Sequence, residues 1–182
     1  MSAVHNADFH SDIEKIDELQ ENIVKDMLEL VGAKEQIMEV IGKVENKEML
    51  AQTLSAENGK PINEARAEIG NISIAFAAFA EQAKHYYGTI IPPGTEAGQQ
   101  STMQLVTREP IGVVACIIPF NFPCDLYDQK VAPALMMGNA AIVLPSSDNP
   151  LTLMKLTEML VEAGVPNGVV QCLTAPGAVK DA

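Results

Sequence analysis

The spacing of hydrophobic residues changes near residue 88 of the chain. Upstream of that point apolar residues recur every three or four positions, which is the period of a helix with one buried face. Helices are expected over 11–31, over 33–44, over a stretch that ends at Asn58-Gly59, and over 61–87. Pro61 suits the start of the last helix, and Gly88 suits the position after its end. The first part of the chain is therefore predicted to be mainly helical.

Downstream of residue 88 the pattern favours strands. "GTIIPPGTEAGQQ" predicts turns, and "STMQLVTRE" alternates as a half-exposed strand does. "IGVVACII", "AAIVL" and "GVVQCLT" are almost continuously apolar, which is typical of strands buried on both faces. Two amphipathic stretches separate these runs: 123–137 stops at Gly138, and "NPLTLMKLTEMLVEAG" lies between a capping Asn149 and a stop at Gly164.

Strand, helix, strand, helix, strand is the order of a parallel α/β sheet. We therefore predict an α/β fold, in which N-terminal helices precede a partial parallel βαβαβ Rossmann-like half-sheet. The boundary is placed near Pro110, with a helical part and one strand over 1–109 and the βαβαβ unit over 110–182. Three strands are few for a doubly wound domain, so we expect the chain to be truncated.

Composition narrows the possible partners. Among 182 residues, 12 basic against 24 acidic side chains give a formal net charge of −12, which disfavours nucleic acid as a partner. A small phosphate-bearing ligand stays possible, because backbone amides can hold it. We expect no membrane span and no secretory signal, and hence a cytoplasmic protein. Three cysteines without CxxC spacing and three scattered histidines predict neither a disulfide framework nor a metal site.

Candidate chemistry gathers in "ACIIPFNFPCD", where the first buried strand meets the following helix. Cys124 is a possible nucleophile, since a helix N-terminus can lower a thiol pKa. No histidine or glutamate lies nearby in the sequence to act as its base, however, so packing is the favoured role. Cys116 and Cys172 are expected in the core of strands. From the residues alone, Asn121 is a helix cap for the helix that starts at Pro123.

Four runs change this interpretation when they are taken together: "ENGKPINEARAEI", "EPIGVVACIIPFNFP", "KVAPALMMGNAAIVLPSSDNPLT" and "VEAGVPNGVVQCLT". In order and spacing they resemble the NAD(P)-dependent aldehyde dehydrogenases, over about residues 50–176. The resemblance implies that 110–182 is part of a dinucleotide-binding domain. It also implies an aldehyde substrate, oxidised to an acid or thioester with NAD or NADP as cofactor, and a possible homo-oligomer.

The resemblance assigns roles to individual residues. Asn121 would donate its side-chain amide to the aldehyde oxygen, where charge develops during the reaction. The turn after the second buried strand carries Leu144 and Ser147 where the family has a lysine and a glutamate that hold the adenosine ribose, which predicts a weak or altered ribose site. Loss of the glutamate is compatible with NADP. The residues expected to contact the cofactor are Ile117, Ile118, Pro119, Phe120, Leu144, Ser146 and Ser147.

Other matches have simpler explanations. Lys130 matches a lysine close to the family's active site, although a solvated or ion-paired lysine is the favoured alternative. The run Asn58-Gly59-Lys60-Pro61 matches a family motif, yet the end of one helix and the start of the next explain it.

Three functional hypotheses follow. The first is the N-terminal portion of an aldehyde dehydrogenase, inactive alone because the family's nucleophilic cysteine and general-base glutamate come from downstream segments. The second is a non-catalytic nucleotide-binding or interaction module whose open sheet is completed by a partner chain. The third is a small enzyme that uses Cys124. The resemblance favours the first.

Overall fold

The computed structural model describes residues 35–174, apart from 87, 93–96, 99–101 and 103. The helix expected over 11–31 lies outside this range. A helical segment covers 35–42, within the second expected helix. The elements that follow are α2 (Val44–Asn58), α3 (Ile62–Ala83), β1 (Thr89–Ile91), β2 (Gln104–Val106), β3 (Val113–Ile118), α4 (Pro123–Met136), β4 (Ala140–Pro145), α5 (Pro150–Glu162) and β5 (Val170–Cys172).

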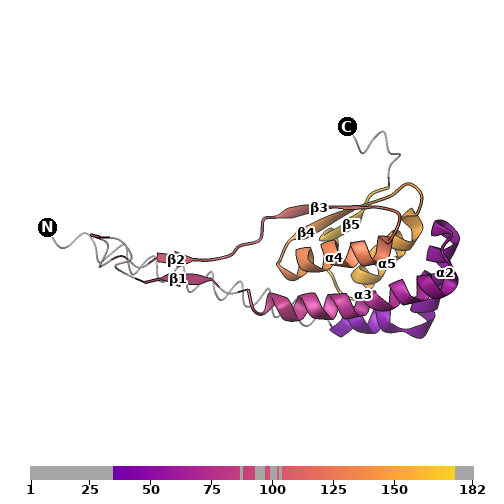
Figure 1. Ribbon diagram of the computed structural model, residues 1–182, viewed down its shortest axis with the longest axis horizontal. Helices are drawn as coiled ribbons and strands as arrows, with labels where there is room; N and C mark the ends of the chain where they lie inside the picture. Colours follow the sequence, from indigo (N-terminus) through magenta and orange to yellow (C-terminus); the bar gives the residue numbers. More distant parts are fainter. Residues whose placement is uncertain (1–34, 87, 93–96, 99–101, 103, 175–182) are drawn as a thin grey trace.

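Strands β3, β4 and β5 form a parallel sheet in that order, which confirms the predicted α/β fold. The register pairs Val113 with Ala140 and Ala141 with Val170. Helices α4 and α5 connect the strands and cover one face of the sheet, and α2 and α3 pack on the outside of these two helices (Figure 1). The described chain thus has three layers: the sheet, an inner pair of helices and an outer pair.

The core forms where these layers meet. Helix α3 buries Ile69, Ile72 and Phe76, whose spacing of three and four places them on one face. Tyr127 of α4 is fully buried, and its hydroxyl lies 3.1 Å from Oγ1 of Thr157 on α5. Because one cluster of buried residues runs from the outer helices to the sheet, the helical part and the sheet fold against each other.

The expectation that all three apolar strands are buried on both faces is wrong for the edge strands β3 and β5. In β5, Gln171 is exposed. The residues of β3 alternate, so that Cys116 and Ile118 face the helices while Val113 and Ile117 are exposed. Within the part of the chain that the structure describes, no helix covers this second face (Figure 1). The strand therefore carries apolar residues on both sides but has helices on one side only. We call this second side of the sheet the open face.

Glycines mark the helix ends, with one correction. Helix α2 ends before Gly59 as the sequence predicts; Gly59 has a φ of 77°, and its N–H donates to Ser55 O at 3.0 Å. Helix α3, however, ends at Ala83 rather than at residue 87. Gly88 is needed for another reason, because a Cβ on it would lie 2.3 Å from the backbone oxygen of Val106. It allows the chain before β1 to approach β2 closely.

The β1–β2 hairpin was not predicted as such. "GTIIPPGTEAGQQ", interpreted as turns, contains β1, which pairs antiparallel with β2 from Thr89↔Val106 to Ile91↔Gln104. Strand β2 is exposed along its whole length rather than half-exposed, because the hairpin extends away from the layered body (Figure 1). A run of three residues is too short to show an alternating pattern, which is why the first strand escapes detection.

Replacing Gly88 with alanine is expected to loosen this hairpin and leave the body intact. The added Cβ collides with backbone, which cannot move aside as a flexible side chain can. Amide hydrogen exchange should become faster in β1 and β2, while the denaturant midpoint of the whole chain changes little. Gly70→Ala on α3 is the control, since nothing lies within 4 Å of a Cβ there. Unchanged exchange in the hairpin would contradict this account of Gly88.

No helix among the described residues has the length and apolar character needed to cross a membrane.

Candidate functional site

The residues between β3 and α4, 119–122, form a loop at the carboxyl edge of the sheet, and we call this loop the corner. All four residues are exposed, whereas Pro123 and Cys124 directly after them are buried. The turn that follows β4, 146–149, lies at the same edge because β3 and β4 are parallel. Ligands of parallel α/β sheets bind at this edge, so the corner and the turn form the candidate site.

The backbone of the corner is held by residues far away in the sequence. Asn58, at the end of α2, and Asn149, before α5, both donate their side-chain amides to Phe120 O, at 2.5 and 2.9 Å. The ammonium of Lys60 donates to Asn121 O at 3.1 Å and lies 4.7 Å from the centre of the Phe122 ring. Two successive carbonyl groups of the corner are therefore fixed by three donors.

Lys60 is paired with Glu68 of α3, and the two side chains are only 8% and 3% exposed. The second oxygen of Glu68 accepts the backbone N–H of Cys124 at 2.8 Å and that of Asp125 at 3.4 Å. The carboxylate thus caps the N-terminus of α4 while it compensates the buried ammonium. Together Asn58, Lys60, Glu68 and Asn149 are called the clamp.

The clamp corrects the interpretation of Asn121 as a helix cap. Phe122 is the N-cap residue of α4, and its side chain accepts no hydrogen bond from the helix. The backbone N–H of Cys124 donates instead to the carboxylate of Glu68. Asn121 is exposed, with its backbone carbonyl bound to Lys60. Its side-chain amide is consequently not used to begin α4.

The cap of α5 also differs from the expected one. Asn149 occupies the N-cap position, but its amide binds Phe120 and makes no cap. Glu57 of α2 instead accepts the N–H groups of Leu151 and Thr152, at 2.5 and 2.8 Å, and the Thr152 hydroxyl at 2.6 Å. At this edge, therefore, the first backbone N–H groups of α4 and α5 donate to glutamate side chains. In many dinucleotide-binding folds the corresponding N–H groups of a helix hold phosphate.

The structure brings some predicted cofactor residues together and separates another. Ile117 pairs with Leu144 in the parallel register; Ile117 is 63% exposed on the open face, and Leu144 beside it is half-buried. Pro119 and Phe120 follow in the exposed corner. Ile118 is the exception: it is 2% exposed and faces the helices, because side chains alternate along a strand. It adds no surface to the apolar shelf that the sequence predicted.

Two further polar residues lie at this edge. Asp148 follows Ser147 in the turn; its N–H donates to Ser146 Oγ at 3.3 Å, and that oxygen lies 3.3 Å from Asp148 Oδ2. A carboxylate is thus present one residue after Ser147, the position where the resemblance implies a glutamate. Lys130 is half-buried on α4, and its ammonium donates to Ile117 O at 2.5 Å.

The structure does not support a cysteine nucleophile at the corner. Cys116 and Cys124 are fully buried, and burial raises the pKa of both thiols, that of Cys124 well above its usual range. Glu68 adds to the second shift, because a carboxylate beside the thiol opposes formation of a thiolate. Packing is therefore the role of both side chains. Among the described residues no group of His, Cys, Asp or Glu could hold a metal ion.

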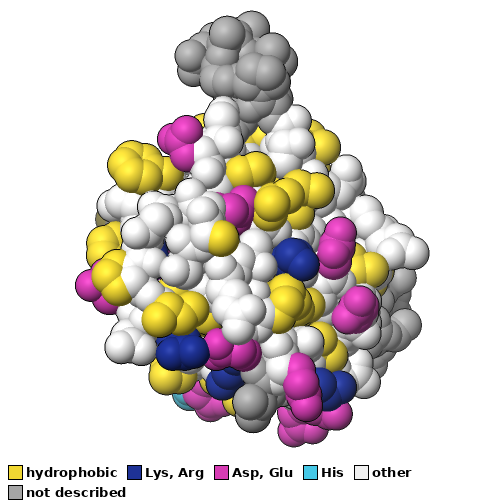
Figure 2. Space-filling model, turned by 90° about the vertical axis from the view of Figure 1, so that its right-hand side faces the viewer, with side chains coloured by type: hydrophobic (Ala, Val, Ile, Leu, Met, Phe, Trp, Pro, Cys, Tyr) yellow, Lys and Arg dark blue, Asp and Glu magenta, His cyan; other side chains and the backbone are white. Residues whose placement is uncertain are grey.

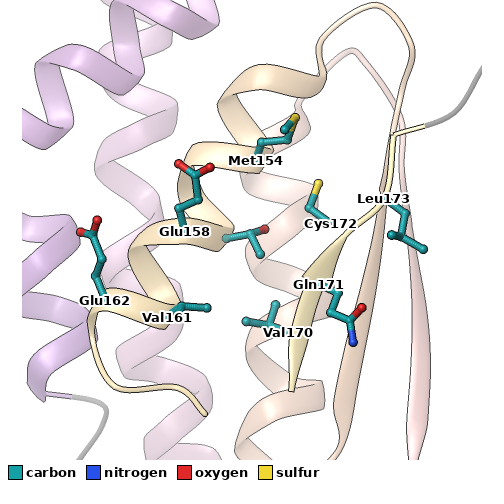
Figure 3. A pocket seen from close by; sticks show the side chains of 9 residues that line it. Met154, Glu158, Val161, Glu162, Val170, Gln171, Cys172 and Leu173 are labelled. Carbon is teal, nitrogen blue, oxygen red and sulfur yellow. The ribbon is translucent and has the colours of Figure 1, made fainter. Parts of the chain in front are cut away.

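Cys172 is half-buried and lines a groove of about 530 Å³ between α5 and β5. Met154, Glu158 and Val161 line it from the helix side, and Val170 and Cys172 line it from the strand side (Figure 3). None of the residues predicted to contact aldehyde or cofactor takes part. The groove is therefore separate from the candidate site.

Charged groups on the face shown in Figure 2 are mixed in sign. At the end of the molecule shown in Figure 2, Lys and Arg side chains lie singly among acidic and apolar ones. This distribution agrees with the net charge of −12 and offers no extended cationic surface on that face to a polyanion.

The buried carboxyl of Asp128 on α4 is expected to make the free energy of unfolding depend on pH. Its side chain is 2% exposed on α4, and burial, aided by the nearby charge of Asp125, raises its pKa from 3.8 to about 7. The folded protein therefore holds a proton that the unfolded chain has lost, and the free energy of unfolding falls as the pH rises from 3.8 to about 7.

Asp128→Asn should remove most of this slope. A shift of three pKa units corresponds to at most about 4 kcal/mol, and relaxation around the charge leaves an expected gain of about 2 kcal/mol above neutral pH. Urea unfolding over a pH series measures it, with the exposed Glu158→Gln on α5 as control. An unchanged slope in Asp128→Asn would show that this carboxyl ionises normally in the folded protein.

Comparison with known proteins agrees with this geometry. Residues 29–182 match the aldehyde dehydrogenase family. The chain is 43% identical over 131 residues to a 3-sulfolactaldehyde dehydrogenase of Pseudomonas putida, covering 72% of this chain and 26% of that protein. It is 40% identical over 133 residues to a succinate semialdehyde dehydrogenase of Acinetobacter baylyi, covering 73% of this chain and 27% of that protein.

A solved aldehyde dehydrogenase structure also resembles this chain. The NAD-dependent aldehyde dehydrogenase of Sinorhizobium meliloti superposes with a TM-score of 0.72 at 34% identity, over 80% of this chain and 28% of that one. The chain thus spans between a quarter and a third of the length of these relatives. The match over most of its residues shows that the chain belongs to the aldehyde dehydrogenase family.

Proposed function

We propose that this chain supplies the oxyanion donor and part of the dinucleotide cleft of an enzyme that oxidises an aldehyde. The observation that supports it is the position of Asn121: an exposed amide at the carboxyl edge of the sheet, on a backbone whose carbonyls are fixed by the clamp. A donor held in place before the reaction stabilises developing charge without further reorganisation.

The chemistry follows from the charge that must be stabilised. A cysteine thiolate adds to the aldehyde carbon, a C–S bond forms, and the carbonyl π electrons become a negative charge on oxygen. The amide N–H of Asn121 would donate to that oxygen. As the C=O bond forms again, hydride leaves the carbon, and a bound nicotinamide would accept it. The resulting thioester is then released as an acid by water or as a new thioester by another thiol.

We place the nucleophile and the general base outside the 182 residues. Cys116 and Cys124 are buried with raised thiol pKa values, and Cys172 lines a groove that contains none of the corner residues. The division near Pro110 would then separate the outer helices and hairpin from the start of the dinucleotide-binding unit. By itself the chain would not turn over aldehyde.

The cofactor would lie along the open face, beside Ile117, Pro119, Phe120 and the turn after β4. Leu144 and Ser147 would make the ribose site weak, and NAD and NADP are both candidates. The substrate would be a small aldehyde; the relatives named above act on sulfolactaldehyde and succinate semialdehyde.

The exposed apolar residues of the extended hairpin would favour association. Ile90, Leu105 and Val106 are exposed there. A two-stranded hairpin is marginally stable alone, so a second copy of the chain or a complementing segment would cover this surface.

The proposal is tested by exchange of a segment. In the Acinetobacter baylyi succinate semialdehyde dehydrogenase, the matching 133 residues are replaced by those of this chain, and formation of reduced nicotinamide is followed with aldehyde present. We expect turnover from the chimera and none from the isolated 182-residue chain. A folded but inactive chimera would contradict the proposal. Turnover by the isolated chain that is lost in Cys124→Ser would support the small-enzyme hypothesis instead.

A further inference from the structure

The clamp fixes the backbone of the corner but leaves its side chains exposed. Phe120 and Asn121 have their carbonyl groups bound, while their side chains reach solvent. An exposed loop at a sheet edge is ordinarily among the mobile parts of a fold. Here three donors from the outer helices and the start of α5 act on two successive peptide groups. The arrangement restricts motion in the part of the loop that carries the candidate donor.

The Lys60–Glu68 pair is a costly way to obtain a stable helix end. Both charges are almost completely buried, and removing two charges from water costs several kcal/mol for each ion before their attraction is counted. A neutral residue that accepts the Cys124 N–H would cap α4 without that cost. What the ammonium adds is its bond to Asn121 O and its contact with the Phe122 ring. Helix stability alone therefore does not explain the lysine.

We propose that Lys60, held by Glu68, is a positioning residue that keeps Asn121 in the orientation required for donation to the aldehyde oxygen. The role of Asn121 as donor to the aldehyde oxygen rests on the proposed function. The restriction of the Asn121 backbone by Lys60 does not. The run "NGKP" then has two roles, since it ends α2 and also supplies Asn58 and Lys60 to the corner. Glu68 and Asn149 complete the set from α3 and from the turn before α5.

The test uses the complete 182-residue chain and the double variant Lys60→Met/Glu68→Gln. Methionine keeps the length of the stem without the ammonium, and glutamine keeps an acceptor for the Cys124 N–H, so no lone charge is left buried. The readout is the backbone order parameter of Asn121 and Phe122 by NMR relaxation. We expect a decrease from about 0.85, the value of rigid backbone, to below about 0.6, with α4 and the sheet unchanged.

Two controls keep the result interpretable. Arg66→Gln breaks the exposed pair of Arg66 with Glu48 on the same outer helices and should leave the corner rigid. Asn58→Ala keeps both buried charges and removes only the bond to Phe120 O, so it separates the contribution of Asn58 from that of Lys60. If the double variant does not fold, Lys60→Arg takes its place: it keeps a cation beside Glu68 and replaces the ammonium at Asn121 O by a guanidinium of different geometry. Loosening confined to the corner supports the proposal.

A corner as rigid in the Lys60 variants as in the parent chain would overturn the proposal. Because this readout requires no turnover, it is independent of the exchange experiment. A loosened corner together with an inactive chimera would leave the mechanical role of Lys60 in place and reject the proposed function. A rigid corner together with an active chimera would reject the positioning role of Lys60 and leave the proposed function in place.

Discussion

Replacing Glu68 with alanine is expected to lower the free energy of unfolding by about 3–5 kcal/mol, because it leaves a buried ammonium without its counter-ion. The Lys60 side chain is 8% exposed, and Glu68 is its ion-pair partner. The substitution also removes the acceptor for the N–H of Cys124, which adds roughly 1 kcal/mol for the lost helix cap. Urea or thermal unfolding of the purified chain measures the change.

A double-mutant cycle separates the pair from its surroundings. Lys60→Met alone and Glu68→Gln alone should each be nearly as damaging as Glu68→Ala, since each leaves one buried charge unpaired. Lys60→Met combined with Glu68→Gln should recover most of the loss, because neither charge then remains buried. Glu48→Ala is the matched control: it breaks an exposed Arg66–Glu48 pair, and we expect a much smaller change. Equal losses from Glu48→Ala and Glu68→Ala would contradict this account of the buried pair.

The elements of the fold that depend on local patterns could be predicted from the sequence. Helix α2 ends where glycine and proline follow Asn58, and α4 and α5 begin with proline at or next to the expected residue. The parallel order of β3, β4 and β5 follows from the alternation of strands and helices. These signals act over a few residues, so one sequence contains them in full.

Features that depend on distant contacts were missed. The close approach of Gly88 to Val106 can be recognised only when both strands are in place, so the glycine was interpreted as the end of a helix. Exposure of one face of β3 could not be foreseen either, because the strand is apolar on both sides. The pattern of a strand reports what its faces can pack against, not which helices are present to do so.

The clamp shows the same limit at the candidate site. Residues some 60 positions apart meet at the corner, and nothing local indicates that Lys60 binds Asn121 O. One signal was available: Glu68 lies on the apolar face of α3, between Ala65 and Ile72, with a lysine eight residues before it. An acidic residue on a buried face needs a partner, and this could have suggested the pair. Its contact with α4 still required the structure.

Asn121→Ala in the chimeric enzyme is expected to have the largest effect on activity. Loss of a fixed donor to a developing oxyanion lowers kcat by about 10²–10³-fold, or roughly 3–4 kcal/mol. Alanine leaves the backbone carbonyl and its bond to Lys60 in place, so the change is confined to the side-chain amide. Binding of the aldehyde in the ground state involves little charge on its oxygen, and KM should therefore change far less than kcat.

The most direct test of the account is the kcat of this variant beside that of Asn167→Ala, an exposed asparagine just before β5 at the other edge of the sheet. We predict a decrease of about 10²–10³-fold for Asn121→Ala with both proteins folded, and no change for Asn167→Ala. A kcat for Asn121→Ala equal to that of the unmodified chimera would contradict the central claim that this amide is the oxyanion donor.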